Sequence, residues 1–157
     1  MIPQKQQTQF SPLQYIKTRV RSLPIHKCYI NSNWKQSGMA SIIVVRKHTE
    51  AKFTFGVYLV DLFALGTKNT FFNFSQTQNT IDDLISRDNF IEIDYSKAHN
   101  IIYGANQFAE DNGFKIHKDF KKITQYILEI DDDKIPLIDI EFGKDGKPLI
   151  ISGFDFI

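Results

Sequence analysis

The amino-acid sequence predicts a single α+β domain, a mostly antiparallel sheet with about four helices packed on one side of it. Apolar residues alternate along segments 40–48 and 53–63, which only a short link separates, and this indicates an antiparallel hairpin. Other segments repeat apolar residues every three or four positions, as helices do. A chain of 157 residues is long enough for one sizeable core. We therefore expect one domain over residues 11–157, after a flexible, glutamine-rich tail at 1–10.

The helices are predicted from apolar periodicity and from their end signals. The first helix starts at Ser11, a good N-cap, with Pro12 in the first helical position, and it ends before Pro24. Three further helices are expected at 81–87 with Thr80 as its cap, at 97–111 between a Ser96 cap and an Asn112-Gly113 stop, and at 118–130.

The strands are predicted from alternation. In segment 40–48 both alternate sets of residues are apolar, which is typical of a central strand covered on both faces. The expected strands are 27–31, 40–48, 53–63, 69–74 and 90–94, followed by a C-terminal hairpin over 136–152 that turns at Asp145-Gly146.

Charge is divided unevenly along the chain. Residues 1–60 contain nine Lys and Arg and one acidic residue, whereas residues 61–157 contain ten Lys and Arg and seventeen acidic residues. Such an imbalance can mark a basic surface for a polyanion. The alternative is that the two halves pack together and neutralise each other.

The leading functional hypothesis is a non-enzymatic interaction module that binds nucleic acid or an acidic partner protein and needs no cofactor. Cations neutralise phosphates, and exposed aromatic rings stack on bases. The candidate nucleic-acid-binding residues are Lys17, Arg19, Arg21, Trp34, Lys35, Arg46 and Lys47.

The alternative hypothesis is a metal-dependent hydrolase, possibly a nuclease, with Asp61 and His99 as catalytic residues. Asp61 would share a strand face with five apolar residues of 53–63, and a carboxylate there is costly unless it is paired, metal-bound or protonated. His99 lies in the first turn of a helix, where the dipole favours a neutral base or ligand. Mg²⁺ or Mn²⁺ would be held with help from Asp94. The structural alternatives are that Asp61 caps a turn and that His99 hydrogen-bonds a neighbouring loop.

Several other classes are disfavoured by the sequence. It has no phosphate-loop, dinucleotide-binding or nucleophile-elbow pattern. No apolar run approaches the ~20 residues that cross a bilayer. The start of the chain is not a signal peptide, and the single cysteine forms no internal disulfide. We therefore expect a cytoplasmic protein with no membrane association.

Three segments resemble an uncharacterised bacterial domain family of hypothetical proteins. They are "DYSKAHNIIYGANQFAEDNGFKIHKDF" at 94–120, "DIEFGKDGKPLII" at 139–151 and "YLVDLFALGTKN" at 58–69. The resemblance implies a bacterial intracellular protein and supplies no activity or site.

A ribonuclease-H-like arrangement is disfavoured, because "KCYINSNW" offers no acid on the first strand.

Overall fold

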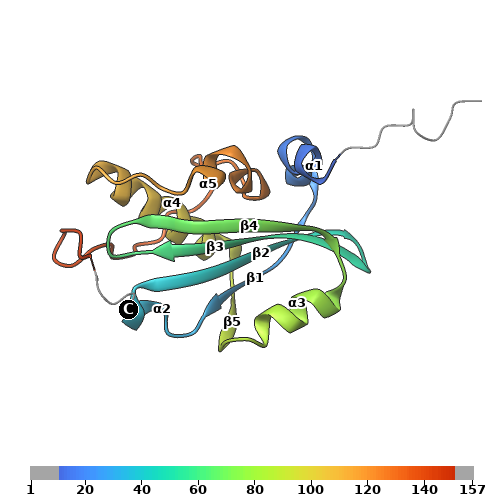
Figure 1. Ribbon diagram of the computed structural model, residues 1–157, viewed down its shortest axis with the longest axis horizontal. Coiled ribbons are helices and arrows are strands. Elements are labelled where there is room, and N and C mark those ends of the chain that lie inside the picture. The colour runs from blue at the N-terminus through green and yellow to red at the C-terminus, as the bar shows by residue number, and fades with distance from the viewer. Residues whose placement is uncertain (1–10, 151–157) are drawn as a thin grey trace, which may run out of the picture.

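A computed structural model describes residues 11–150 and shows a five-stranded antiparallel sheet with helices packed on it (Figure 1). The strand order is β4-β3-β2-β1-β5. The predicted α+β class is confirmed. The strands are β1 (Ile25–Asn31), β2 (Met39–Thr49), β3 (Lys52–Asp61), β4 (Gly66–Gln76) and β5 (Phe90–Ile93).

Strand β2 lies in the middle of the sheet, as the sequence predicts. Its side chains alternate between two apolar clusters: Ile42 and Val44 belong to the larger one, and Ile43 and Val45 to the smaller one. All four are at most 1% exposed. The apolar character of both alternations in 40–48 therefore has a direct cause, because both faces of this strand are covered.

The larger cluster lies between the sheet and a layer of helices. These are α1 (Pro12–Thr18), η2 (Val20–Ser22), α4 (Tyr95–Asp111), α5 (Lys118–Lys122) and η3 (Thr124–Ile127). Helix α1 begins as predicted, since the Ser11 side chain accepts a hydrogen bond from the Gln14 amide at 3.1 Å. Helix α4 begins two residues earlier than predicted, with Asp94 and not Ser96 in the N-cap position.

The smaller cluster lies on the opposite face, under helix α3 (Gln78–Ile85). Figure 1 shows α3 on the other side of the sheet from α1, α4 and α5. The prediction that all helices lie on one side is therefore wrong. Ile81 of α3 packs against Phe53 and Phe55 of β3, and this contact buries apolar surface that one helical layer would leave in water.

A short helix that the sequence did not predict, α2 (Trp34–Ser37), joins β1 to β2. It ends at Gly38 in the left-handed conformation (φ 71°). A side chain at position 38 would also collide with the Phe63 ring. Glycine is therefore required here both by the backbone and by packing.

The predicted helix at 118–130 is interrupted at Ile123, whose backbone leaves the helical region (φ −134°, ψ −67°). The next residue, Thr124, is held by the sheet. Its carbonyl accepts a hydrogen bond from the Tyr58 hydroxyl at 2.7 Å, and its own hydroxyl contacts that of Thr70 at 2.8 Å. These contacts replace the helical pattern, so the chain forms α5 and then η3.

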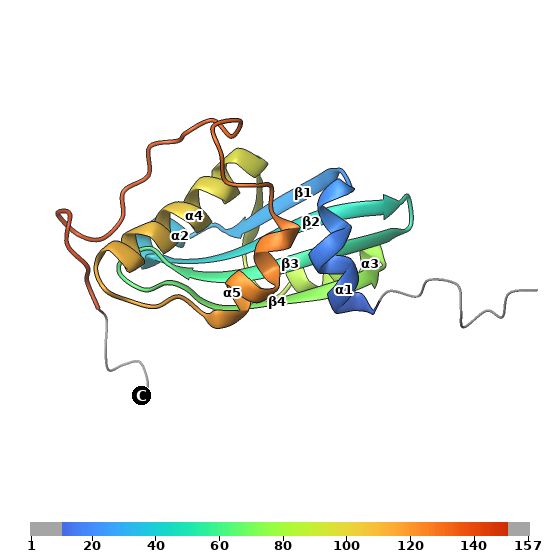
Figure 2. The ribbon, with the colours of Figure 1, turned by 90° about the horizontal axis from the view of Figure 1, so that it is seen from above.

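The predicted C-terminal hairpin is also corrected. Its turn at Asp145-Gly146 forms, closed by an isolated bridge between Lys144 and Lys147, but residues 136–142 form neither helix nor strand. We call residues 136–144 the strap. It runs along α4 (Figure 2). The end of the expected hairpin at 151–152 and the expected tail at 1–10 lie outside the described residues.

The strap is fixed at both ends. The Asn100 amide of α4 donates to the Pro136 carbonyl at 2.9 Å, and its oxygen accepts from the Ile138 amide at 3.3 Å. At the other end the Gly143 amide donates to the Leu62 carbonyl at 2.9 Å.

No helix within residues 11–150 has the length and apolar character needed to cross a bilayer.

Candidate basic pocket between the strap and helix α2

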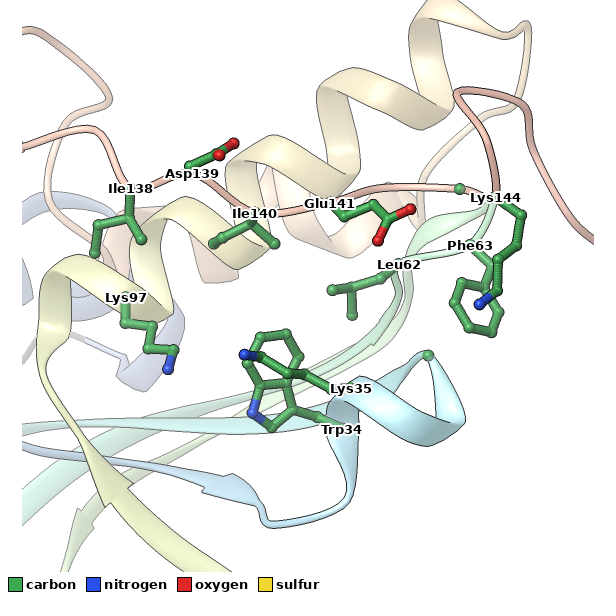
Figure 3. A pocket seen from close by; sticks show the side chains of 12 residues that line it. Trp34, Lys35, Leu62, Phe63, Lys97, Ile138, Asp139, Ile140, Glu141 and Lys144 are labelled. Atoms are coloured by element: carbon green, nitrogen blue, oxygen red, sulfur yellow. The ribbon is translucent and has the colours of Figure 1, made fainter.

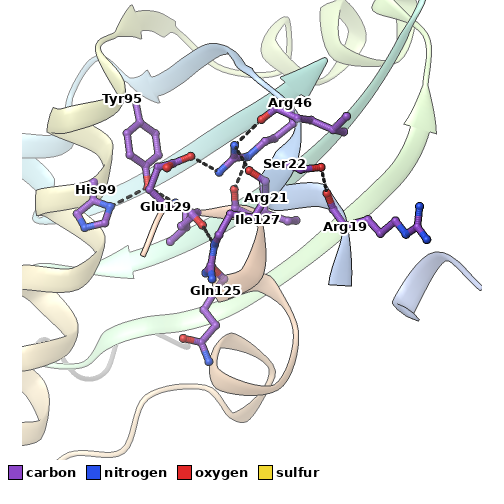
Figure 4. A network of polar contacts seen from close by, with 11 residues as sticks. Arg19, Arg21, Ser22, Arg46, Tyr95, His99, Gln125, Ile127 and Glu129 are labelled. Atoms are coloured by element: carbon purple, nitrogen blue, oxygen red, sulfur yellow. Dashed lines mark hydrogen bonds and ion pairs between the residues drawn. The ribbon is translucent and has the colours of Figure 1, made fainter. Parts of the chain in front are cut away.

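The predicted basic residues do not form one surface. Arg46 shows this most clearly. Its side chain is 1% exposed and lies inside a polar network (Figure 4). The guanidinium donates to the carbonyls of Ile127 at 2.8 Å and Leu23 at 2.6 Å, and to a carboxylate oxygen of Glu129 at 2.7 Å. The expectation that Arg46 contacts a polyanion is therefore corrected: the residue joins three segments of the interior.

Two more of these cations are engaged with the protein itself. Arg21 donates to the carbonyls of Leu128 and Gln125 at 2.7 and 3.0 Å. Lys47 pairs with Glu50 at 2.6 Å. Both side chains are partly buried, and each already has partners within the protein.

Of the three exposed cations in the predicted set, Lys35 lies far from Lys17 and Arg19. Lys17 and Arg19 belong to α1 and to the residue that follows it, and Lys35 belongs to α2. Figures 1 and 2 both place α1 and α2 toward opposite ends of the sheet. The cations of residues 11–60 thus do not form a single basic flank.

Asp61 has a structural partner in the turn after β3. Its carboxylate accepts a hydrogen bond from the Phe63 amide at 2.9 Å and is 9% exposed. Its neighbours Val60 and Leu62 belong to the cluster under α4. Asp61, lying between them, faces the other side of the sheet.

His99 of α4 is 2% exposed, and both its ring nitrogens are occupied. Nδ1 contacts the Tyr95 hydroxyl at 2.7 Å, and Nε2 contacts a carboxylate oxygen of Asp131 at 2.9 Å. The Tyr95 oxygen also accepts from the Glu129 amide at 2.7 Å. Because an ionised carboxylate only accepts hydrogen bonds, Nε2–H donates to Asp131. In the neutral ring Nδ1 is then an acceptor, and the Tyr95 hydroxyl donates to it. This series of hydrogen bonds connects α4 to the segment that follows η3.

The structure therefore does not bring the two proposed catalytic residues together. Asp61 faces the side of the sheet away from α4, whereas His99 lies on α4 itself. Asp94 is an exposed residue at the start of that helix. Within residues 11–150 no three His, Cys, Asp or Glu side chains are grouped so that they could hold a metal ion.

Cys28 is no candidate nucleophile either. It is 1% exposed on β1, and burial raises the pKa of its thiol to about 12. The reactive species is the thiolate, which this environment suppresses at neutral pH.

A pocket of about 320 Å³ opens between the strap and α2 (Figure 3). Trp34 and Lys35 line it from α2, Lys97 lines it from the first turns of α4, and Leu62 and Phe63 line it from the turn after β3. The strap closes the remaining side with Ile140, Glu141 and Lys144, among others. The walls thus come from four segments that are distant in sequence.

Three lysines converge on this pocket, each over an aromatic ring. The ammonium groups of Lys35 and Lys97 lie 5.5 and 5.4 Å from the centre of the Trp34 ring, and that of Lys144 lies 5.3 Å from the centre of the Phe63 ring. Attraction to the ring face positions a cation without cancelling its charge. The aromatic rings therefore hold the ammonium groups in place while leaving their net charge intact.

No carboxylate within residues 11–150 forms an ion pair with these three lysines. The lysines that do form ion pairs there are Lys27, Lys47 and Lys121. The strap contributes two acids to the lining, Asp139 and Glu141. Figure 3 shows the Glu141 side chain on the side of Lys144, whereas Asp139 lies on the far side of the strap from Trp34. The part of the pocket around the indole is thus dominated by positive charge.

Sequence reasoning found Trp34 and Lys35 and missed Lys97 and Lys144. The last two lie in the acidic half of the chain, so the division of charge gave no reason to select them. A local signal exists only for Lys97, which lies in the first turn of α4, where the helix dipole disfavours a cation. A cation in an unfavourable position is worth examining as a functional group.

Comparisons with known proteins add no assignment. No family model matches the chain, and no curated protein or solved structure was found to match it. The resemblance to a bacterial family of hypothetical proteins therefore stays an expectation, and the functional argument depends on the geometry of this chain.

Proposed function

We propose that this protein is a non-enzymatic binding module that holds an anionic partner, a nucleic acid or an acidic protein, at the pocket between the strap and α2. The observation that carries the proposal is the convergence of Lys35, Lys97 and Lys144 on one concave site without ion-pair partners among residues 11–150.

Like charges that converge in a hollow repel one another, and the repulsion is relieved when an anion binds among them. The low-dielectric walls of a cleft also concentrate the field of the cations that line it. Lys35 and Lys97 both lie close to the same indole ring, and we propose that one phosphate or carboxylate group contacts both. Lysine acts here as a compact point charge, which suits phosphate.

The proposal keeps the predicted class of function but moves the site. Trp34 and Lys35 remain from the sequence-based set, and Lys97 and Lys144 join them. Trp34 is only 6% exposed. It therefore supports the two lysines above it and does not offer a free ring face to a base.

The test is a comparison of two triple variants with equal net charge. Lys35→Gln, Lys97→Gln and Lys144→Gln together remove the pocket cations. Lys17→Gln, Lys118→Gln and Lys122→Gln remove three exposed lysines outside it. Binding of a labelled single-stranded oligonucleotide and of labelled polyglutamate is measured by fluorescence anisotropy at low salt.

The pocket variant is expected to lose about 100-fold in affinity for the polyanion that binds. This follows from about 1 kcal/mol for each charge contact near water. The control variant should stay close to the wild-type protein. Equal losses in the two variants would show that only net charge matters, and this would overturn the proposed site.

A further inference from the structure

Building on the proposed function, we infer that the pocket recognises the sugar phosphate of a ribonucleotide, either free or within a single strand. Lys35 and Lys97 hold the phosphate, and Glu141 of the strap accepts hydrogen bonds from the ribose hydroxyls.

The size of the pocket selects a small unit. Its volume of about 320 Å³ lies near the lower end of the range for small-molecule sites. A space of this size admits a single nucleotide. The surface of a duplex or of a folded acidic protein would remain outside it and reach few of the lysines.

Glu141 selects a ligand that brings hydrogen-bond donors as well as negative charge. Its carboxylate lines the pocket and has no hydrogen-bond or ion-pair partner among residues 11–150. An ionised carboxylate only accepts hydrogen bonds, and it repels a ligand that carries nothing but negative charge. A ribose supplies donors close to its phosphate, and acidic side chains are known partners of the ribose 2′-hydroxyl in nucleotide sites.

The aromatic rings of the pocket make no contact that would distinguish one base from another. Trp34 is buried, with Lys35 and Lys97 over its ring, and Lys144 lies over Phe63. Selectivity for one base requires hydrogen bonds to its edge or stacking on a free ring. Recognition therefore depends on the sugar phosphate, and different bases should bind with similar affinity.

The experiment is calorimetric titration of the full chain with AMP, UMP, 2′-deoxy-AMP, ribose 5-phosphate and inorganic phosphate. AMP and UMP are expected to bind alike, and 2′-deoxy-AMP about tenfold more weakly, since it lacks one charge-assisted hydrogen bond. Ribose 5-phosphate should bind nearly as well as AMP. A labelled oligoribonucleotide and its deoxy counterpart, measured in parallel, show whether the free or the polymeric form is preferred.

Glu141→Gln separates the role of this residue from simple charge. The amide should reduce the preference for AMP over 2′-deoxy-AMP to about twofold or less, and it should strengthen the binding of inorganic phosphate because a repelling charge is gone. Asp139→Gln removes the same charge from the side of the strap that faces away from Trp34 and should leave the preference unchanged.

The outcomes distinguish this inference from the proposed function. Equal binding of AMP and 2′-deoxy-AMP, or an unchanged preference in Glu141→Gln, overturns the assignment of the ribose while binding of polyanions at the three lysines still stands. If the triple lysine variant binds polyanions as well as the wild-type protein does, the proposed function and this inference both fall.

Discussion

At the scale of single residues, the contrast between Arg46 and the pocket lysines shows how burial decides what a cation does. Arg46 is enclosed, and its guanidinium satisfies the carbonyls of Leu23 and Ile127 together with the Glu129 carboxylate. Backbone carbonyls inside a protein need such donors. Arg46 is therefore a structural residue, although the sequence gives it the same basic context as Lys47.

Replacement of Arg46 by Met should lower the free energy of unfolding by about 3 kcal/mol, because buried carbonyls lose their donor and Glu129 loses its counter-ion. Glu129 is 40% exposed, so water limits the loss. The matched control is Arg87→Met, which breaks the exposed Arg87–Asp83 pair and should cost less than about 0.5 kcal/mol. Urea denaturation measures both; a loss for Arg46→Met no larger than the control would contradict the structural role.

Asp61 shows what sequence reasoning could and could not decide about one residue. The pattern of 53–63 identified a carboxylate on an apolar strand face and left open whether it binds a metal or caps a turn. The hydrogen bond from the Phe63 amide supports the second possibility. That bond depends on where the strand ends, and a strand end is set by the turn geometry around Gly66 and not by the alternation of side chains.

At the scale of elements, the sequence predicts features that depend on neighbouring residues better than features that depend on tertiary contacts. The start of helix α1 and its cap are predicted, because Ser11 and Pro12 act within one turn of the chain, whereas its end at Thr18, before η2, is not. Helix α2 was missed, since four residues carry no periodicity. The sequence does not predict the break at Ile123, because the next residue, Thr124, is held by the Tyr58 hydroxyl of a distant strand.

The structure of the strap explains why its sequence alternates as that of a strand does. Ile140 and Phe142 pack against the larger core cluster, whereas Asp139 and Glu141 are exposed. Alternation therefore reports an extended chain with one buried face, and it does not require a hydrogen-bonded neighbour. Here the buried face rests on helix α4, so no ladder forms.

Gly104 allows the strap to lie close to α4. A Cβ at this position would collide with the Phe142 ring, which accounts for a helical glycine that costs about 1 kcal/mol relative to alanine. We predict that Gly104→Ala displaces Phe142 and loosens the strap, so that the amides of Ile138 and Gly143 exchange with solvent faster. Amide hydrogen exchange measures this effect.

The control for Gly104→Ala is Gln107→Ala at an exposed position of the same helix, which should leave these two amides as protected as in the wild-type protein. Unchanged protection in Gly104→Ala would mean that Phe142 does not anchor the strap.

At the scale of the whole molecule, charge counted along the sequence was a poor guide to charge in space. The basic first half supplies one pocket lysine, Lys35, and the acidic second half supplies Lys97 and Lys144. Of the other early cations predicted to bind, Arg46 is buried, Arg21 and Lys47 have partners within the protein, and Lys17 and Arg19 lie far from α2. The fold class could be predicted because it follows from local patterns. The site could not, because α2, the turn after β3, α4 and the strap meet only in the folded protein.

The fold also provides a direct reporter for this site. Trp34 is the only tryptophan of the chain, and it lines the pocket beneath two of the three lysines. Its fluorescence therefore responds to what occupies the pocket, without any attached label.

The most direct test of the central claim is the salt dependence of polyanion binding, measured through the fluorescence of Trp34. If Lys35 and Lys97 neutralise one phosphate of a single strand and Lys144 a second, the logarithm of the binding constant should fall with the logarithm of salt concentration. The Lys35, Lys97 and Lys144 triple variant should then flatten that slope by about 1.4. A slope that is unchanged in this variant would contradict the claim that these lysines form the binding site.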